Sequence, residues 1–219
     1  MKINTTTETP IAINEKEIKE SEHFVYLGSV VDKQEGTDRD VNTRIGKART
    51  AFMMLKNIWN STQIKKTTKL RIFNSNVKTV LLYGCETWRT TKATTHRLQT
   101  FMNTCLRRIL KINWQDKVTN EDLWHNGAQD PIDKQILKRK WGWIGHTLRK
   151  PPTSITRQVL TWNPQGKRKR GRPRNSWRRD TEMELSRQGI SWREAERAAQ
   201  SRVRWRGVVN GLYSPGPKG

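Results

Sequence analysis

Hydrophobic positions recur every three or four residues over most of the chain, which is the spacing of a helix with one apolar face. This pattern predicts a first helix over residues 38–59, with an apolar stripe formed by Val41, Ile45, Ala48, Phe52, Leu55 and Trp59. Further helices are expected over residues 64–82, 94–112, 131–149 and 175–188. A last helix opens at the capping box Ser191-Trp192-Arg193-Glu194 and runs through Trp205.

A different pattern occupies residues 11–31, where β-branched and aromatic residues replace the helical spacing. Ile11, Ile13 and Ile18 bracket the polar Asn14-Glu15-Lys16, which is typical of a hairpin, and residues 24–31 are rich in strand-forming side chains. The fold class that follows is mainly α: a short N-terminal antiparallel β-ribbon, then a helical bundle, then a smaller C-terminal helical region.

Breaks in these patterns divide the chain into six segments. Residues 163–174 carry no apolar side chain beyond two prolines, so they can form no core and are expected to be an exposed linker. The expected segments are the β-ribbon (1–36), a three-helix unit (37–115), a connecting helical segment (116–162), the basic linker (163–174), a C-terminal helical pair (175–213) and a disordered tail (214–219).

The 219 residues include 43 lysines and arginines against 20 aspartates and glutamates, a net charge of +23. This charge is graded, because residues 1–60 are neutral overall, residues 61–130 carry +7 and residues 131–219 carry +16. Of the 22 cations in the last segment, 15 are arginines, whose planar groups bind phosphate bidentately and stack on bases. RNA and DNA are therefore the expected partners.

The sequence lacks the signals of several other classes of protein. No run approaches the ~18 apolar residues of a membrane-spanning helix, and residues 1–30 lack the pattern of a signal peptide, so no membrane partner is expected. Cys85 and Cys105 are too few for a disulfide framework and are expected to be reduced and buried. His146 has no carboxylate or thiol near it in sequence, so a packed or solvent-facing histidine is expected. We find no constellation of catalytic residues, and neither a cofactor nor a small-molecule substrate is expected.

The strongest local signal is the basic linker. Its cations are Lys167, Arg168, Lys169, Arg170, Arg172 and Arg174, and Arg178 and Arg179 follow in the next helix. The Arg-Gly-Arg-Pro sequence at 170–173 is similar to the core of an AT-hook, which lies in a narrow minor groove. A run of cations is also typical of a nuclear import signal or a general phosphate clamp. The general interpretation is favoured, because a single hook is a weak signal.

Tryptophan is unusually frequent, with ten residues against three tyrosines. Four tryptophans lie on the apolar stripes of predicted helices and are expected in the core: Trp59, Trp141, Trp177 and Trp205. Trp143 and Trp162 lie off these stripes beside basic residues, so they are the candidates for stacking on bases.

Several short sequence motifs, taken in order, resemble one known family. They are Phe24-Val25-Tyr26-Leu27-Gly28-Ser29, Leu82-Tyr83-Gly84-Cys85-Glu86-Thr87-Trp88, Arg107-Arg108-Ile109-Leu110, Arg139-Lys140-Trp141-Gly142-Trp143-Ile144-Gly145-His146-Thr147-Leu148 and Lys169-Arg170-Gly171-Arg172-Pro173-Arg174. Together they resemble the C-terminal part of endonuclease-reverse transcriptases from non-long-terminal-repeat retrotransposons, over about residues 10–210.

The resemblance implies an RNA-directed DNA polymerase as the parent protein. Tyr26, Leu27 and Gly28 are similar to the primer grip at the end of the palm, and the helices that follow are similar to the thumb. The paired aspartates that hold Mg²⁺ in the parent polymerase have no match, since no Asp-Asp pair occurs in this sequence. The resemblance thus implies a catalytically incomplete remnant of a transposable element that binds RNA template and DNA primer, with the remaining polymerase portion as a further partner.

Two other functions are compatible with the residues. A domesticated DNA-binding or chromatin module would use the Arg-Gly-Arg-Pro segment as its working part. A protein-interaction scaffold would account for the helices, but not for the charge of +16 over residues 131–219. The basic segment favours a nuclear over a cytoplasmic location.

Overall fold

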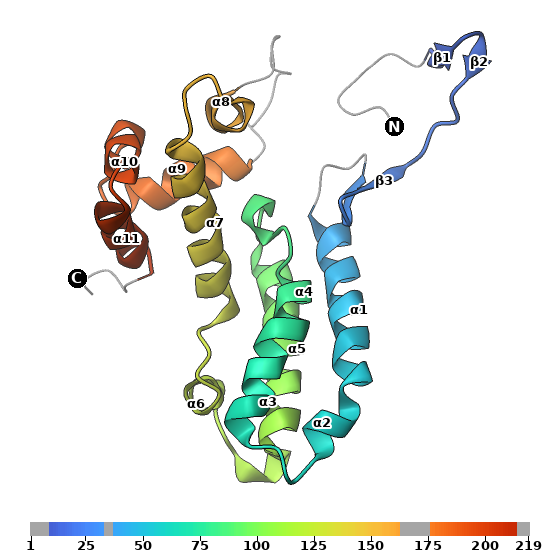
Figure 1. The fold of residues 1–219 in the computed structure, drawn as a ribbon, viewed down its shortest axis with the longest axis vertical. Coiled ribbons are helices and arrows are strands. Elements are labelled where there is room, and N and C mark those ends of the chain that lie inside the picture. The colour runs from blue at the N-terminus through green and yellow to red at the C-terminus, as the bar shows by residue number, and fades with distance from the viewer. Residues whose placement is uncertain (1–8, 33–36, 163–175, 214–219) are drawn as a thin grey trace. The chain divides into compact units, whose positions relative to one another are not determined.

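The computed structural model describes residues 9–32, 37–162 and 176–213. These residues are mainly helical, with short β-hairpins near the N-terminus, which confirms the predicted fold class (Figure 1). The chain divides into two compact units: Met1–Gly84 with Thr90–Ala128, and Cys85–Arg89 with Gln129–Gly219. In the described part of the chain, no helix is long and apolar enough to cross a membrane.

The N-terminal strands form two separate hairpins, whereas one ribbon was expected. β1 (Ala12–Ile13) pairs antiparallel with β2 (Lys16–Glu17), and β3 (His23–Tyr26) pairs antiparallel with β4 (Ser29–Asp32). Each two-residue turn has positive φ at both residues: 50° and 64° at Asn14-Glu15, 48° and 81° at Leu27-Gly28. Such turns match the twist of paired strands, and the hairpin predicted around residues 14–16 is thereby confirmed, with Asn14-Glu15 as its turn and Lys16 in β2.

The helices of the first unit pack against one another, with the longer ones lying side by side (Figure 1). They are α1 (Asp38–Met54), α2 (Lys56–Asn60), α3 (Lys66–Ile72), the π-helical turn η1 (Phe73–Lys78), α4 (Thr79–Leu81), α5 (Lys92–Leu110), the 3₁₀ turn η3 (Trp114–Asp116) and α6 (Asn120–Asn126). Phe52 stacks on Trp59 with ring centroids 5.0 Å apart and meets Phe73 edge-on at 6.4 Å, so aromatic contacts join three elements of the core.

Two predicted helices are interrupted. The helix expected over 38–59 breaks at Leu55, and the indole N–H of Trp59 donates to the carbonyl of Phe52 at 2.7 Å. This bond satisfies an acceptor at the end of α1, where the regular helical donors stop. The helix expected over 64–82 contains η1 in its middle, which the apolar spacing does not distinguish from an α-helix.

The second unit is built on α7 (Ile132–Leu148), with which the turn η2 (Cys85–Thr87) makes contact. The other helices are α8 (Ile155–Thr161), α9 (Trp177–Ser186), α10 (Trp192–Ala199) and α11 (Arg202–Gly211).

 The predicted last helix is thus two helices, because the Ser201 side chain caps α11 by accepting from the backbone N–H of Arg204. The capping box at Ser191 and Glu194 is confirmed.

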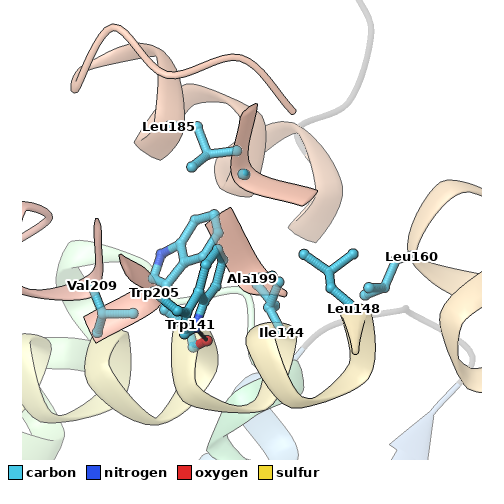
Figure 2. Packing of buried hydrophobic residues seen from close by; sticks show 9 residues of the cluster. Trp141, Ile144, Leu148, Leu160, Leu185, Ala199, Trp205 and Val209 are labelled. Atoms are coloured by element: carbon cyan, nitrogen blue, oxygen red, sulfur yellow. Dashed lines mark hydrogen bonds between the residues drawn. The ribbon is translucent and has the colours of Figure 1, made fainter. Parts of the chain in front are cut away.

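The core of the second unit lies along one face of α7, and Figure 2 shows its side chains. Trp141, Ile144 and Leu148 of α7 meet residues from the other four helices: Leu160, Leu185, Ala195, Ala199, Trp205 and Val209. Residues 129–162, which the sequence groups as a connecting segment, therefore share a core with the C-terminal helices. Helix α8 was not predicted, since it is only seven residues long and buries Leu160 alone among its described side chains.

Candidate nucleic-acid interface

The turn between β3 and β4 presents apolar side chains to solvent. Tyr26 is 62% exposed and Leu27 is 73% exposed, although both belong to residue types that are usually buried at least in part. The rings of Phe24 and Tyr26 lie on one face of β3 with centroids 6.4 Å apart. The predicted primer-grip residues thus form the tip of a hairpin, with Leu27 and Gly28 as its two turn residues.

Arg44 of α1 fixes this tip to the helix. Its guanidinium Nη2 donates to the carbonyl of Gly28 at 2.7 Å and to the hydroxyl of Ser29 at 3.2 Å. One turn earlier, the Asp40 carboxylate accepts the backbone N–H of Val30 at 2.9 Å and lies 3.8 Å from Nε of Arg44. Both side chains are buried, so the hairpin is held by charged groups that water does not screen well.

Tyr83 completes the arrangement from a distant part of the sequence. The Arg44 guanidinium lies over the Tyr83 ring, 4.4 Å from its centroid, which is a cation–π geometry. The next residue, Gly84, has φ of 76°, and a Cβ at this position would lie 3.2 Å from the Ser29 hydroxyl. Two of the motifs that carry the family resemblance, at 24–29 and 82–88, therefore meet through Tyr83, Gly84 and Arg44.

Asp40 and Arg44 were missed in the sequence analysis. A signal for Arg44 was present, because position 44 lies between Val41 and Ala48 on the stripe that faces the core. A charged residue on such a stripe is buried only when it has partners. Its partners, however, are 15, 16 and 39 residues away, and helical spacing does not identify them.

The predicted nucleic-acid-binding residues of the second unit are only partly described. Lys167, Arg168, Lys169, Arg170, Arg172 and Arg174 lie outside the described residues. Arg179 and Trp162 are exposed, and Trp162 is 62% accessible. Arg178 is engaged within the protein, since its Nε donates to Glu182 at 2.9 Å and its Nη1 to the carbonyl of Thr161 at 2.7 Å.

Trp143, the other predicted stacking residue, is half-buried. Its ring meets Trp177 edge-on, with centroids 6.2 Å apart, beside the core of the second unit. Lys140 lies 5.3 Å from the centroid of Trp177 and pairs with Glu184 at 2.9 Å. Only part of the Trp143 ring is thus available to a ligand, whereas Trp162 is largely open.

The tryptophans predicted for the core mostly lie there. Trp59, Trp141 and Trp205 are buried, while Trp177 is half-buried and its indole N–H donates to the carbonyl of Glu86 at 2.9 Å. His146 is exposed, so of the two expected alternatives, packed or solvent-facing, the second is the one observed. No group of three or more potential metal ligands occurs within residues 9–32, 37–162 and 176–213.

The two cysteines are free and buried, which confirms their predicted state. Burial raises the pKa of each thiol from 9.0 to about 12, and for Cys85 the neighbouring Glu86 adds to this effect. A thiol with such a pKa stays protonated at neutral pH, where the thiolate is the reactive form. Both residues therefore act as core side chains.

Comparisons with known proteins point to a mobile element. Residues 51–83 match a sequence family described as a domain of unknown function (DUF6451). The chain is 27% identical over 176 residues to an uncharacterized transposon-derived protein of Caenorhabditis elegans, an alignment that covers 78% of this chain and 62% of the relative. No solved structure matches the chain. The chain is thus similar to a transposon-derived protein and spans less than two thirds of that relative's length.

Proposed function

We propose that this chain is a nucleic-acid-binding part of a transposable-element protein related to reverse transcriptases. In this proposal the β3–β4 hairpin contacts the end of a DNA primer paired with an RNA template. The transposon-derived relative supports the origin, and the motifs quoted above support the relation to reverse transcriptases.

The observation that carries the proposal is the combination of an exposed tip with a fixed turn. Tyr26 and Leu27 are open to solvent, while Arg44 holds the turn through Gly28 and Ser29. A loop that only connects two strands needs no buried arginine beneath it. A surface that binds a ligand with little loss of conformational freedom does benefit from a turn fixed in advance.

The charge of the chain supports a polyanionic ligand. A net charge of +23 raises the local concentration of nucleic acid and its rate of association, and it gives an affinity that falls with salt. The exposed rings of Tyr26 and Trp162 offer faces on which bases stack. The same proposal holds that this chain by itself does not polymerise, because its sequence has no Asp-Asp pair to anchor two magnesium ions.

Binding of the full chain to fluorescent nucleic acids tests the proposal. The probes are an RNA template with a recessed DNA primer and a blunt duplex of equal length, and anisotropy reports the dissociation constants. We expect both to bind at low salt, with a preference for the recessed primer. Tyr26→Ser and Leu27→Asn should reduce this preference, since asparagine tolerates the positive φ at position 27.

Ile13→Ser provides a matched control, because Ile13 lies in the other hairpin and is 62% exposed, the same fraction as Tyr26. This variant should bind both probes as the wild type does. Wild-type affinity no greater than that of a neutral control protein would refute nucleic-acid binding. Equal effects of the Tyr26 and Ile13 variants would refute the role of the hairpin tip.

A further inference from the structure

One face of α7 carries two lysines, a glycine and a histidine. Lys134, Lys138, Gly142 and His146 follow one another at intervals of four residues, and all four are exposed. Because residues four apart lie on one face of a helix, they form a continuous stripe of roughly 18 Å at about 1.5 Å per residue. We call these four residues the α7 stripe; it contains two lysines, one histidine and no carboxylate.

The two glycines of α7 differ in their surroundings. Gly145 faces the core, and a Cβ there would lie 2.0 Å from Nε1 of Trp205, so packing requires a glycine. Gly142 is exposed, and among the described residues no atom lies within 4 Å of a Cβ built on it. Packing among the described residues therefore explains the glycine at position 145 and gives no reason for the one at position 142.

A glycine inside an exposed helix lowers stability relative to alanine, since it loses more backbone entropy on folding. One use of such a residue is to let another molecule approach the helix backbone closely. At Gly142 the flanking groups on the same face are the ammonium group of Lys138 and the imidazole of His146, both hydrogen-bond donors to an anion.

We infer that the phosphate backbone of a nucleic acid crosses α7 at Gly142, between Lys138 and His146. This inference rests on the proposed nucleic-acid binding and adds a contact surface in the second unit. The absence of a side chain at Gly142 lets the sugar-phosphate chain reach the helix surface, and the α7 stripe supplies hydrogen-bond donors on both sides. A protein partner fits less well, because the cores of protein interfaces are depleted of lysine.

The test substitutes Gly142 in the full chain. Gly142→Ala and Gly142→Gln should raise the melting temperature, since both residues favour helix more than glycine does. The Gln side chain should weaken nucleic-acid binding by about fivefold to tenfold, the loss expected when a close phosphate contact is blocked. Stability and affinity thus change in opposite directions, which a purely structural role for Gly142 does not produce.

Gly46→Gln on α1 is the matched control. Gly46 is also an exposed helical glycine, and no described residue beyond its own helix backbone has an atom within 4 Å of a built Cβ, but its neighbours four residues away are the uncharged Asn42 and Thr50. This variant should raise the melting temperature and leave affinity unchanged. The probes are a mixed-sequence RNA–DNA duplex and single-stranded DNA of the same length, measured by anisotropy in the same buffer.

The pattern of losses identifies the source of the phosphates. A loss confined to the duplex assigns the α7 stripe to paired nucleic acid, and a loss confined to the single strand assigns it to unpaired nucleic acid; either supports the inference. Gly142→Gln binding both probes within about twofold of the wild type would overturn it, a change worth well under 1.4 kcal/mol. Wild-type protein that binds neither probe would instead overturn the proposed function itself.

Discussion

The indole N–H of Trp205 on α11 donates a hydrogen bond of 3.0 Å to the backbone carbonyl of Trp141 on α7 (Figure 2). The two rings lie 5.9 Å apart and are tilted by 53°. Trp141 in turn donates its indole N–H to Glu184 of α9 at 2.8 Å. Three helices of the second unit are thus joined by two buried indoles whose polar atoms are all paired, as a buried tryptophan requires.

Gly145 makes this approach possible, and Gly145→Ala should destabilise the chain. The added methyl group would overlap Trp205, whose Nε1 would lie 2.0 Å away. Overpacking of this kind lowers the free energy of unfolding by about 1–3 kcal/mol, more than alanine gains over glycine in a helix. Urea unfolding followed by tryptophan fluorescence measures the change. Gly46→Ala, at an open position, should increase stability; an equal increase in Gly145→Ala would contradict the packing.

The Arg44 anchor of the hairpin gives a local prediction. Arg44→Met removes the bonds to Gly28 and Ser29 and the ion pair with the buried Asp40, so we expect a loss of about 2–3 kcal/mol in the free energy of unfolding. Amide hydrogen exchange of residues 29–32 should become faster, because the hairpin loses its attachment to α1.

Arg97→Met controls for the loss of an arginine on the surface. Arg97 donates to Asn42 at 2.9 Å and pairs with Asp38, but its side chain is 38% exposed. Exposed pairs contribute about 0–1 kcal/mol, so this variant should change stability little and leave exchange at 29–32 as in the wild type. Equal exchange in the Arg44 and Arg97 variants would show that Arg44 does not hold the hairpin.

The cysteines predict a loss of stability at alkaline pH. Burial raises the pKa of Cys85 and Cys105 in the folded chain to about 12 from 9.0. Below pH 9 both states keep the thiol protons, and above it the unfolded state releases them first. The free energy of unfolding should therefore fall as the pH rises from 9 toward 12. In the variant with Cys85→Ala and Cys105→Ala, the free energy of unfolding should fall less steeply with pH. Subtracting the curves of the two proteins removes the contribution of the other titrating groups.

Helical spacing predicts which residues face a core, but it does not predict contacts between distant segments. The stripe from Val41 to Phe52 was correct, yet it did not show that Arg44 would meet Tyr83. Breaks were also missed, since Leu55 continues the apolar spacing while the backbone leaves the helix there. Short helices such as α8 give too few periods for the pattern to be recognised.

The candidate site could be predicted only in part for a related reason. The turn at Leu27-Gly28 follows from local sequence. Gly145, in contrast, is distinguished from Gly142 by its close contact with Trp205, which lies 60 residues further along the chain. Trp143 lies off the apolar stripe in sequence, but Trp177 covers its edge from another helix. Exposure of a side chain depends on such neighbours, which no local pattern specifies.

The basic linker gives a last prediction, and it separates the proposed function from the alternative of a DNA-binding chromatin module. If the cations of 167–174 clamp phosphates without reading sequence, the slope of log affinity against log salt on duplex DNA should be about −0.9 per phosphate neutralised. About five contacts would give a slope near −4 to −5. Replacing Arg168, Arg170, Arg172 and Arg174 together by glutamine should make this slope shallower.

The control variant has the same net charge as the linker variant. It replaces four exposed arginines of α10 and α11 by glutamine: Arg193, Arg197, Arg202 and Arg206. A smaller change in slope for this control would locate the phosphate contacts in the linker. Competition between AT-rich and GC-rich duplexes at two salt concentrations then tests minor-groove reading, because the guanine amino group and a wider groove oppose insertion of arginine. We expect a preference below about tenfold, or ~1.4 kcal/mol, as for a general clamp. A larger preference for AT-rich DNA that persists at high salt would favour the chromatin module.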